Sequence, residues 1–485
     1  NYEAARKWFS SYLSEGSVKY RKDALERKAD CIFIAKDYKG AAAAYDVVLK
    51  DYFNVDDIYP YYQAAVAYGL EGNPTRKIEL LKNVMNAMPE SEFYPEALFE
   101  LGRAYVSKYE DDKAFECFRT LADTVKDSTF VARAYIEMGS LSRNQSQYKD
   151  ALAYYRTVVE EMPLSGYSED ALAAIEAIYQ IKNEPEEYIA YIESIGKGGS
   201  KTDSEKEDMI FNSAEQIFLS ENYQKALVSL QSYLEKYPEG RNAYKADFYI
   251  AESYRHTGKY DQACDSYRSV IEHGEGSFVE LSMLNFSELS YKLEKWEDAY
   301  GGYSSLYSAA LIENNKYTAL LGMMRSAYRW HNWNEAVKSA EKVIFDSRSD
   351  AGVKSEAQYV KAKSYLAMSR RDDALAILSK LAEDLSNPYG AEAAYMLIQD
   401  SYDKGDFEEV ENKVYAFSDA GTSQIYWLAK SFVTLGDSFV ERGDLEQAKA
   451  TFESVRDGYE PQSADDDVQA GVALRLEKLS EIMSK

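Results

Sequence analysis

Histidine and cysteine, which often act in catalysis or bind metals, number only three each in this chain of 485 residues. Its three histidines, His256, His273 and His331, are scattered, and none has the spacing to Cys, Asp or Glu that a metal site needs. The sequence contains no G-x-S-x-G nucleophile motif and no HExxH zinc motif. These absences disfavour hydrolytic and metal-dependent chemistry.

Two further segments hold residue types that could bind a ligand, and each has a simpler explanation. The segment GKGGSK at 196–201 lacks the fixed spacing of a phosphate-binding loop, so we expect a flexible loop there. His331 lies in YRWHNWNEA, and we expect it to be a polar turn residue beside Trp330 and Trp333. We therefore predict no catalytic residue, no metal site and no cofactor.

Charge limits the partners of the chain. The sequence has 82 Asp and Glu against 56 Lys and Arg, a net charge of −26. This excess disfavours nucleic acid and anionic membrane surfaces as partners. The sequence has no run of 18 apolar residues, so we predict no direct membrane insertion. The acidic surface is explained by solubility, since like charges repel; a face that recognises a basic protein is the alternative.

Alanine recurs along the chain at a nearly fixed interval, which defines thirteen positions 36 to 38 residues apart that we call the alanine positions. Apolar or aromatic residues follow every one of them after four and after seven residues. Offsets of 0, 4 and 7 lie on one face of a helix. Ten alanine positions hold alanine and three hold other residues: Ala5, Ala41, Lys77, Ala114, Ala151, Tyr188, Ala226, Ala263, Ala299, Ala336, Ala374, Val410 and Ala448.

Another helix is predicted before each alanine position except Ala5. Its residue twelve positions before the alanine position is often small, which permits a close helix crossing: Gly102, Gly139, Ala214, Ala251 and Gly436. One example is Leu98, Leu101, Gly102 and Tyr105, followed by Ala114, Phe118 and Leu121. This order resembles the tetratricopeptide repeat, W-x2-L-G-x2-Y, then A-x3-F, then P. Pro89, Pro163 and Pro238 stand at the closing proline of that pattern.

The resemblance implies an all-α fold, a right-handed superhelix of helix pairs. We expect about twelve units of about 37 residues, plus a leading half unit and a C-terminal helix. Long links such as MPESEFYPEALFELGRAY resemble those of bacterial cell-envelope members, including Tol–Pal associated and outer-membrane assembly types. That likeness implies a periplasmic or envelope location, with the cytoplasm as the alternative.

Aromatic side chains often open the predicted second helices, three residues before the alanine position. We interpret them as packing residues, and they partly account for the 43 tyrosines. They are Tyr2, Tyr38, Tyr148, Tyr223, Tyr260, Trp296, Trp333 and Phe407.

The predicted organisation has five parts. Residues 1–20 hold the second helix of a truncated unit, and 21–195 hold an N-terminal array. A polar loop at 196–208 separates it from a second array at 209–462, and 463–485 form a capping helix. Because the unit of Ala5 lacks a first helix, we expect additional repeats before Asn1 in a longer chain or precursor.

The three cysteines, Cys31, Cys117 and Cys264, lie two or more repeats apart. Stacked helices lie about 8–10 Å from each other, and a disulfide needs α-carbons within about 7 Å. We therefore expect buried free thiols and no intrachain bridge.

The resemblance implies that the first helices line a concave face, where side chains at repeat positions 5, 9 and 12 often meet ligand, with the alanine position numbered 20. Position 5 is frequently aromatic here, which predicts a groove for an extended or helical peptide. The alternative is that the longer repeats bury position 5 in the core. The candidate partner-binding residues are Tyr62, Phe99, Arg103, Phe211, Glu215, Phe248, Glu252, Arg255, Glu288, Tyr291, Arg325, Tyr359 and Lys363.

These observations predict a non-catalytic scaffold or adaptor that binds a protein or peptide. A structural, self-assembling envelope component is one alternative. An enzyme with an unrecognised site is another.

Overall fold

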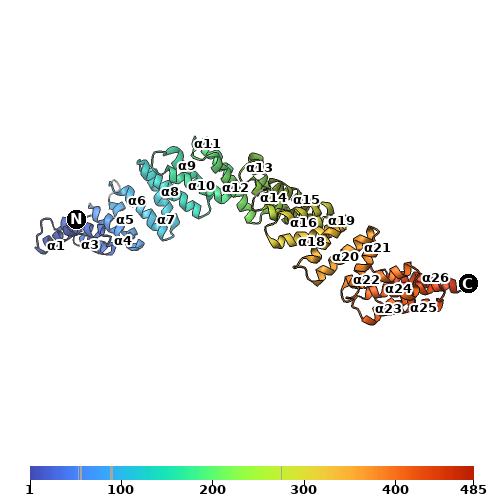
Figure 1. Cartoon of the computed structure of the whole chain (residues 1–485). Coiled ribbons are helices and arrows are strands. Elements are labelled where there is room, and N and C mark those ends of the chain that lie inside the picture. Colours follow the sequence, from blue (N-terminus) through green and yellow to red (C-terminus); the bar gives the residue numbers. More distant parts are fainter. Residues whose placement is uncertain (53, 55–56, 88–90, 275, 485) are drawn as a thin grey trace. The chain divides into compact units, whose positions relative to one another are not determined.

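The computed structural model describes residues 1–52, 54, 57–87, 91–274 and 276–484. These residues form 26 α-helices and one short 3-10 helix, and they contain no β-strand (Figure 1). The predicted all-α solenoid is confirmed. Pro89, which the repeat pattern placed at the end of a unit, lies outside the described residues.

The chain divides into two compact units, Asn1–Gln216 and Ile217–Lys485. The boundary falls inside α12. The first unit contains α1 (Tyr2–Ser14), α2 (Arg21–Ile34), α3 (Tyr38–Asp51), α4 (Tyr59–Glu71), α5 (Pro74–Ala87), α6 (Tyr94–Ser107), α7 (Asp111–Thr124), α8 (Ser128–Asn144), α9 (Tyr148–Glu161), α10 (Ser168–Lys182), α11 (Pro185–Ser194), the 3-10 helix Gly198–Ser200 and most of α12 (Asp203–Leu219).

The second unit continues with the same alternation of first and second helices. It contains α13 (Tyr223–Lys236), α14 (Ala243–His256), α15 (Tyr260–His273), α16 (Val279–Lys292), α17 (Trp296–Ala309), α18 (Glu313–Arg329), α19 (Trp333–Phe345), α20 (Ala351–Ala367), α21 (Arg371–Leu381), α22 (Pro388–Asp403), α23 (Phe407–Ala420), α24 (Ile425–Arg442), α25 (Leu445–Gly458) and α26 (Val468–Met483).

Consecutive helices pack against each other from α1 to α11 and from α13 to α26, and several first helices of adjacent repeats also touch, such as α6 with α8 and α16 with α18. The even-numbered helices are the first helices of the repeats and the odd-numbered ones from α3 are the second helices. A peptide that followed the even-numbered helices would therefore contact several repeats in turn.

The small residues permit the close crossing of the two helices in a repeat. Every alanine at an alanine position from Ala41 onward is fully buried. An added Cβ at Gly102 would lie 2.6 Å from the ring of Phe118, and one at Gly436 would lie 2.4 Å from the ring of Phe452. A larger side chain would force the helix axes apart, beyond the usual separation of about 8–10 Å.

The turn inside each repeat has one conformation. In all twelve turns described, the residue five positions before the alanine position has a positive φ, either a glycine such as Gly72 or another residue such as His331 (φ 61°). Left-handed backbone at this point ends the first helix. The ring of His331 also stacks on Trp333, with centroids 4.9 Å apart. The predicted role of His331 as a turn residue is confirmed.

The predicted loop at 196–208 is shorter than expected, because α12 already begins at Asp203. The Thr202 backbone N–H donates to Glu205 Oε2 over 2.7 Å, and the Glu205 N–H donates to Thr202 Oγ1 over 3.2 Å. This reciprocal capping box starts a helix. The prediction of a loop is wrong for 203–208, although the signal, T-x-x-E, was present in the sequence.

Among the described residues, no helix is both long and apolar enough to cross a membrane.

The three cysteines are free and buried, as predicted. Burial raises the pKa of all three thiols, that of Cys117 to about 11. Because the thiolate is the reactive form, we expect Ellman's reagent to modify none of them at a useful rate in the folded protein at pH 7.5. All three should react once urea unfolds the chain. Rapid release of one equivalent of chromophore from native protein would contradict this packing.

Candidate functional site

The predicted partner-binding residues all lie on first helices, in two separate groups. In the first unit, Tyr62 lies on α4, Phe99 and Arg103 lie on α6, and Phe211 and Glu215 lie on α12. The second group lies on α14 (Phe248, Glu252, Arg255), α16 (Glu288, Tyr291), α18 (Arg325) and α20 (Tyr359, Lys363).

Three residues that were predicted to line a groove are core residues, so the prediction is wrong for them. Phe99, Phe211 and Phe248 are only 4%, 2% and 6% exposed. The ring of Phe248 stacks on Phe278, from the link between repeats, with centroids 4.2 Å apart. The Arg133 guanidinium lies 3.8 Å from the centroid of the Phe99 ring. Side chains from the following repeat and its link cover the rings of Phe99 and Phe248. Because all three rings are buried, none is available to a partner.

Tyr62 and Tyr359, two of the three predicted tyrosines, are only partly covered. Tyr62 packs against Phe93, from the link before α6, with centroids 5.6 Å apart. The hydroxyl of Tyr359 donates to Glu392 Oε1 over 2.7 Å, and its ring lies 5.1 Å from that of Tyr389. Both rings thus serve contacts between repeats while keeping some exposed surface.

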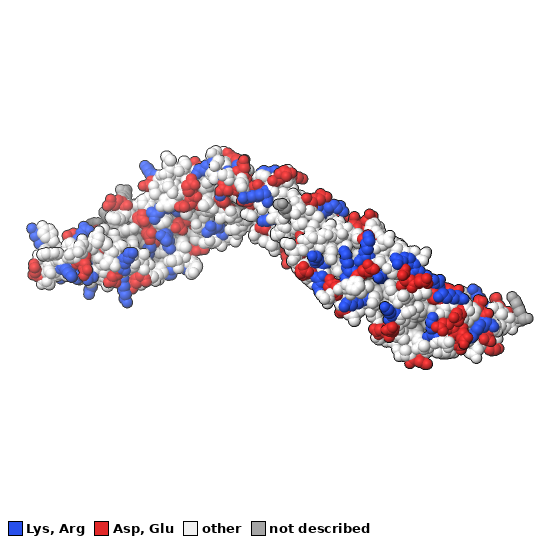
Figure 2. Space-filling view, viewed as in Figure 1, with Lys and Arg blue, Asp and Glu red and all other residues white. Residues whose placement is uncertain are grey.

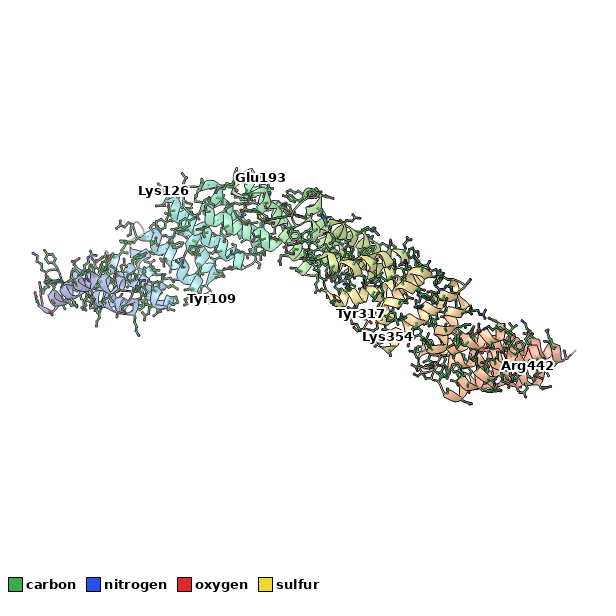
Figure 3. All side chains as sticks on the ribbon, viewed as in Figure 1. Tyr109, Lys126, Glu193, Tyr317, Lys354 and Arg442 are labelled. Carbon is green, nitrogen blue, oxygen red and sulfur yellow. The ribbon has the colours of Figure 1, made fainter. Side chains whose placement is uncertain are left out.

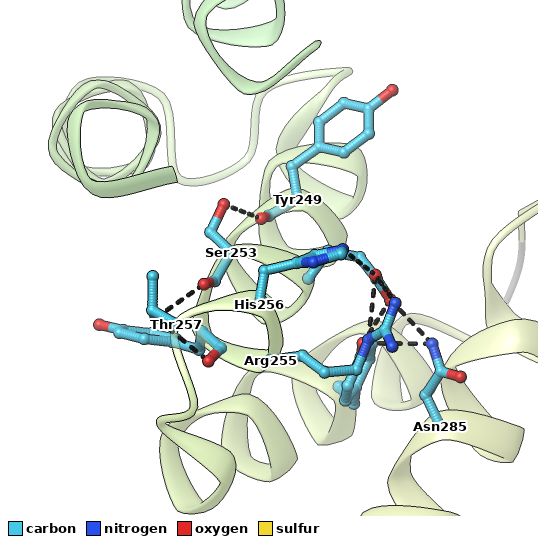
Figure 4. Close-up of polar contacts among 9 residues, drawn as sticks. Tyr249, Ser253, Arg255, His256, Thr257 and Asn285 are labelled. Carbon is cyan, nitrogen blue, oxygen red and sulfur yellow. Dashed lines mark hydrogen bonds and ion pairs between the residues drawn. The ribbon is translucent and has the colours of Figure 1, made fainter. Parts of the chain in front are cut away.

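The prediction that Glu252 faces a groove is also wrong, because its carboxylate is buried in a polar cluster. Glu252 is 7% exposed, and Tyr267 and Asn285 both donate hydrogen bonds to its Oε1, the latter over 2.8 Å. Arg255 Nε donates to Oε2 over 3.1 Å, and His256 Nε2 lies 3.8 Å away (Figure 4). The cluster joins α14, α15 and α16 and uses the charge of Glu252 internally.

Several other predicted charges pair with the next first helix. Arg325 makes a two-pronged contact with Glu356, with both N–O distances 2.7 Å. Lys363 Nζ lies 3.4 Å from Glu392, and Arg103 Nε lies 4.0 Å from Glu137. Glu288 is exposed. Acidic and basic side chains accordingly alternate over the visible surface of each unit (Figure 2).

The first unit contains a hollow of about 650 Å³ between α4, α5 and α6, which we call the α4–α6 hollow. Two predicted residues, Tyr62 and Arg103, line it. Lys77, which replaces alanine at its alanine position, pairs with Glu100 in the wall and is 9% exposed. Its aliphatic chain passes over Gly69, where an added Cβ would lie 2.7 Å from Lys77 Cδ.

Sequence reasoning missed most of this lining. It marked Lys77 as an irregular residue but did not connect it with Glu100, which lies on the next first helix. A lysine in a series of alanines was the available signal. A lysine side chain is too long to fit between the crossing helices as alanine does. It must therefore extend away from the crossing, where its ammonium group can pair with a carboxylate.

Other hollows lie between helices elsewhere in the described part of the chain. One of about 480 Å³ lies between α20, α21 and α22, and we call it the α20–α22 hollow. One of about 280 Å³ lies between α10, α11 and α12, and one of about 390 Å³ lies between α22, α24 and α26. The last is lined by Tyr395 and Asp437, at repeat positions 5 and 9, and by Arg475, which pairs with Asp437 over 2.7 Å.

The described residues contain no group of three or more His, Cys, Asp or Glu side chains that could hold a metal ion. Some residues with polar groups lie in the turns at the ends of the helices, outside the hollows. Tyr109, in the turn between α6 and α7, is 93% exposed and points away from the helices (Figure 3).

A model of the tetratricopeptide repeat family matches residues 245–273 and 426–459. These segments correspond to the helix pairs α14–α15 and α24–α25. A comparison with curated proteins finds no match.

The chain is also similar to solved structures at low identity. A crystal structure of MamA is 22% identical over 36% of this chain and 94% of that chain, with a TM-score of 0.30. A structure of Naa15/Naa10 bound to HypK-THB is 13% identical over 95% and 80%, with a TM-score of 0.35. A tetratricopeptide repeat protein from Parabacteroides merdae ATCC 43184 is 15% identical over 55% and 98%, with a TM-score of 0.28.

TM-scores below 0.5 support no argument about this chain. The assignment depends on the family match, the thirteen alanine positions and the helix pairs that they predict. Stacked repeats of this kind present extended surfaces to partners. The chain therefore carries tetratricopeptide repeats, whose general role is that of a protein-interaction scaffold.

Proposed function

We propose that the protein is a non-catalytic scaffold that binds a protein or peptide partner through its first helices, with the α4–α6 hollow as an anchoring site. The observation that carries this proposal is the hollow itself. Its volume of about 650 Å³ lies within the range of about 300–1,000 Å³ that is usual for ligand pockets.

The lining suits a peptide better than a small apolar ligand. Tyr62, Val66 and Leu70 provide apolar surface, whereas Glu96, Glu100 and Arg103 provide charges. Glu96 is held by Arg133 over 3.0 Å, and Glu100 is held by Lys77. These pairs fix the wall before a partner arrives, and a preformed wall lowers the entropic cost of binding.

Arg103 is the exposed charge at this site, with 58% of its side chain accessible. Replacing Arg103 with glutamate would place a third negative charge beside Glu100 and Glu137. We expect peptides selected on the wild-type protein to bind this variant at least about tenfold more weakly, a loss of about 1.4 kcal/mol. Peptides can be selected by phage display on the full chain, and their affinities measured by fluorescence polarisation.

The matched control is Arg119→Glu, which makes the same charge change on α7, a second helix. Arg119 is exposed and lies outside the hollow. Equal weakening by both substitutions would show a general charge effect and would contradict binding at the hollow. A selection that yields no binding peptide would contradict the scaffold proposal itself.

A further inference from the structure

In five repeats, two aromatic rings pack against each other across the turn between the first and the second helix. One ring lies eight residues before the alanine position and the other lies three residues before it. Their centroids are 4.8 to 5.8 Å apart, and most pairs meet edge to face. The pairs are Phe33–Tyr38, Phe218–Tyr223, Tyr291–Trp296, Tyr328–Trp333 and Tyr402–Phe407.

The second aromatic also reaches the first helix of the following repeat. Tyr223 stacks on His256 with centroids 4.5 Å apart and an interplanar angle of 5°. In the next repeat, the Lys292 ammonium lies 3.9 Å from the centroid of the Tyr260 ring. An aromatic ring at this place therefore occupies the crevice between one turn and the next first helix.

Five repeats have no aromatic residue at either place, and two of them have Val106 and Asp111, and Val440 and Leu445. The other three have Gly69 and Pro74, Gln180 and Pro185, and Leu366 and Arg371.

Three of these five repeats have a hollow at that place. Gly69 and Pro74 line the α4–α6 hollow, and Leu366 and Arg371 line the α20–α22 hollow. Gln180 and Pro185 line the hollow between α10, α11 and α12. On the far wall, Ser107 and Asp403 occupy the repeat position that His256 and Lys292 occupy beside their rings. The hollows thus lie where other repeats hold a ring.

We propose that the α4–α6 and α20–α22 hollows are receptor sites for aromatic side chains of an extended peptide segment in a partner protein. This inference rests on the proposed scaffold function and names the chemistry of the partner. The chain itself shows that this crevice accepts an aromatic ring, because Tyr223 and Tyr260 occupy it in their repeats. The third hollow, at about 280 Å³, is below the usual size of a ligand pocket and is not included.

The surroundings of both hollows suit an aromatic ring. The α20–α22 hollow has an apolar floor of Leu366, Leu375 and Met396. At its rim, Arg371 Nη2 lies 2.6 Å from Asp400. In the α4–α6 hollow, Arg103 offers a cation for the face of a ring, as Lys292 does for Tyr260.

A substituted tryptophan side chain of the protein itself can fill each of the two hollows. Pro74→Trp and Arg371→Trp place tryptophan as the first residue of α5 and α21, where Trp296 and Trp333 already begin α17 and α19. The double variant should fold and close both hollows. Pro74→Ala with Arg371→Ala is the matched control, because it removes the same proline and the same Arg371–Asp400 pair while leaving the hollows open.

Two measurements on the full chain test the proposal. Saturation-transfer NMR with N-acetyl-tryptophanamide should give a signal with the wild type and with the double alanine variant, reduced at least about fivefold in the double tryptophan variant. N-acetyl-leucinamide should give a weaker signal than the tryptophan probe. Peptides selected by phage display should be rich in aromatic residues and should bind the filled variant at least about tenfold more weakly.

The outcomes separate this inference from the proposed function. Peptides that bind the wild type and the filled variant equally would overturn the aromatic sites and leave the scaffold function standing. An unchanged signal from N-acetyl-tryptophanamide on the filled variant would also overturn the inference. If no peptide is selected, the scaffold function fails, and the tryptophan probe still decides whether the hollows accept an aromatic ring.

Discussion

Replacing Phe248 with alanine is expected to lower the free energy of unfolding of its repeats by about 3–5 kcal/mol. The Phe248 side chain is 6% exposed and lies among Tyr267, Phe278 and Tyr249. Its removal leaves a cavity that the surrounding rings cannot close, because each is held by its own helix or link. The loss includes the transfer of the ring to water and the cost of that cavity.

The exposed Phe345, at the end of α19, provides the control. It is 87% exposed, so Phe345→Ala should change stability by no more than about 0.5 kcal/mol. Solenoids can unfold in segments, so urea denaturation followed by circular dichroism should be combined with hydrogen exchange of the α14 amides. A Phe248→Ala protein as stable as the Phe345→Ala protein would show that Phe248 is a surface residue.

Replacing Glu252 with alanine is expected to cost about 2–3 kcal/mol of stability, because its buried partners would lose their acceptor. Burial and the neighbouring Glu252 raise the pKa of Tyr267, so this hydroxyl stays protonated and must donate. Asn285 would also lose its 2.8 Å hydrogen bond to Glu252. Urea denaturation of the variant against the wild type measures the loss.

Two further variants identify the cause. Glu288 occupies the same repeat position one repeat later and is exposed, so Glu288→Ala should have little effect. Adding Tyr267→Phe to Glu252→Ala should restore part of the stability, since the phenylalanine has no hydroxyl left without a partner. Additive losses in the double variant, or an equal loss in Glu288→Ala, would contradict a buried network.

The fold follows from local patterns that the chain repeats many times. The alanine positions predicted the paired helices, and the structure places these alanines at fully buried crossings. Gly102 and Gly436 were expected to be small for the same reason, and their neighbouring rings leave no space for a Cβ. Such patterns are readable because both partners of each contact lie within about 20 residues of each other.

The candidate site was less predictable from the sequence. Whether an aromatic at repeat position 5 faces solvent depends on Phe93 and Phe278, which lie in the links between repeats. Whether the carboxylate of Glu252 is buried and paired depends on Tyr267 and Asn285, which lie on the two following helices. Neither set of contacts follows from the periodicity of a single helix.

The sequence by itself determined the repeat, its helix pairs, the free state of the thiols and the aromatic residues that open most second helices. The tertiary structure decided which of the predicted groove residues are core, which charges are already paired and where the crevices between repeats stay open. The physical reason is the range of the interactions. Helix pairing depends on neighbours in the chain, whereas burial and cavities depend on what the next repeat places against each side chain.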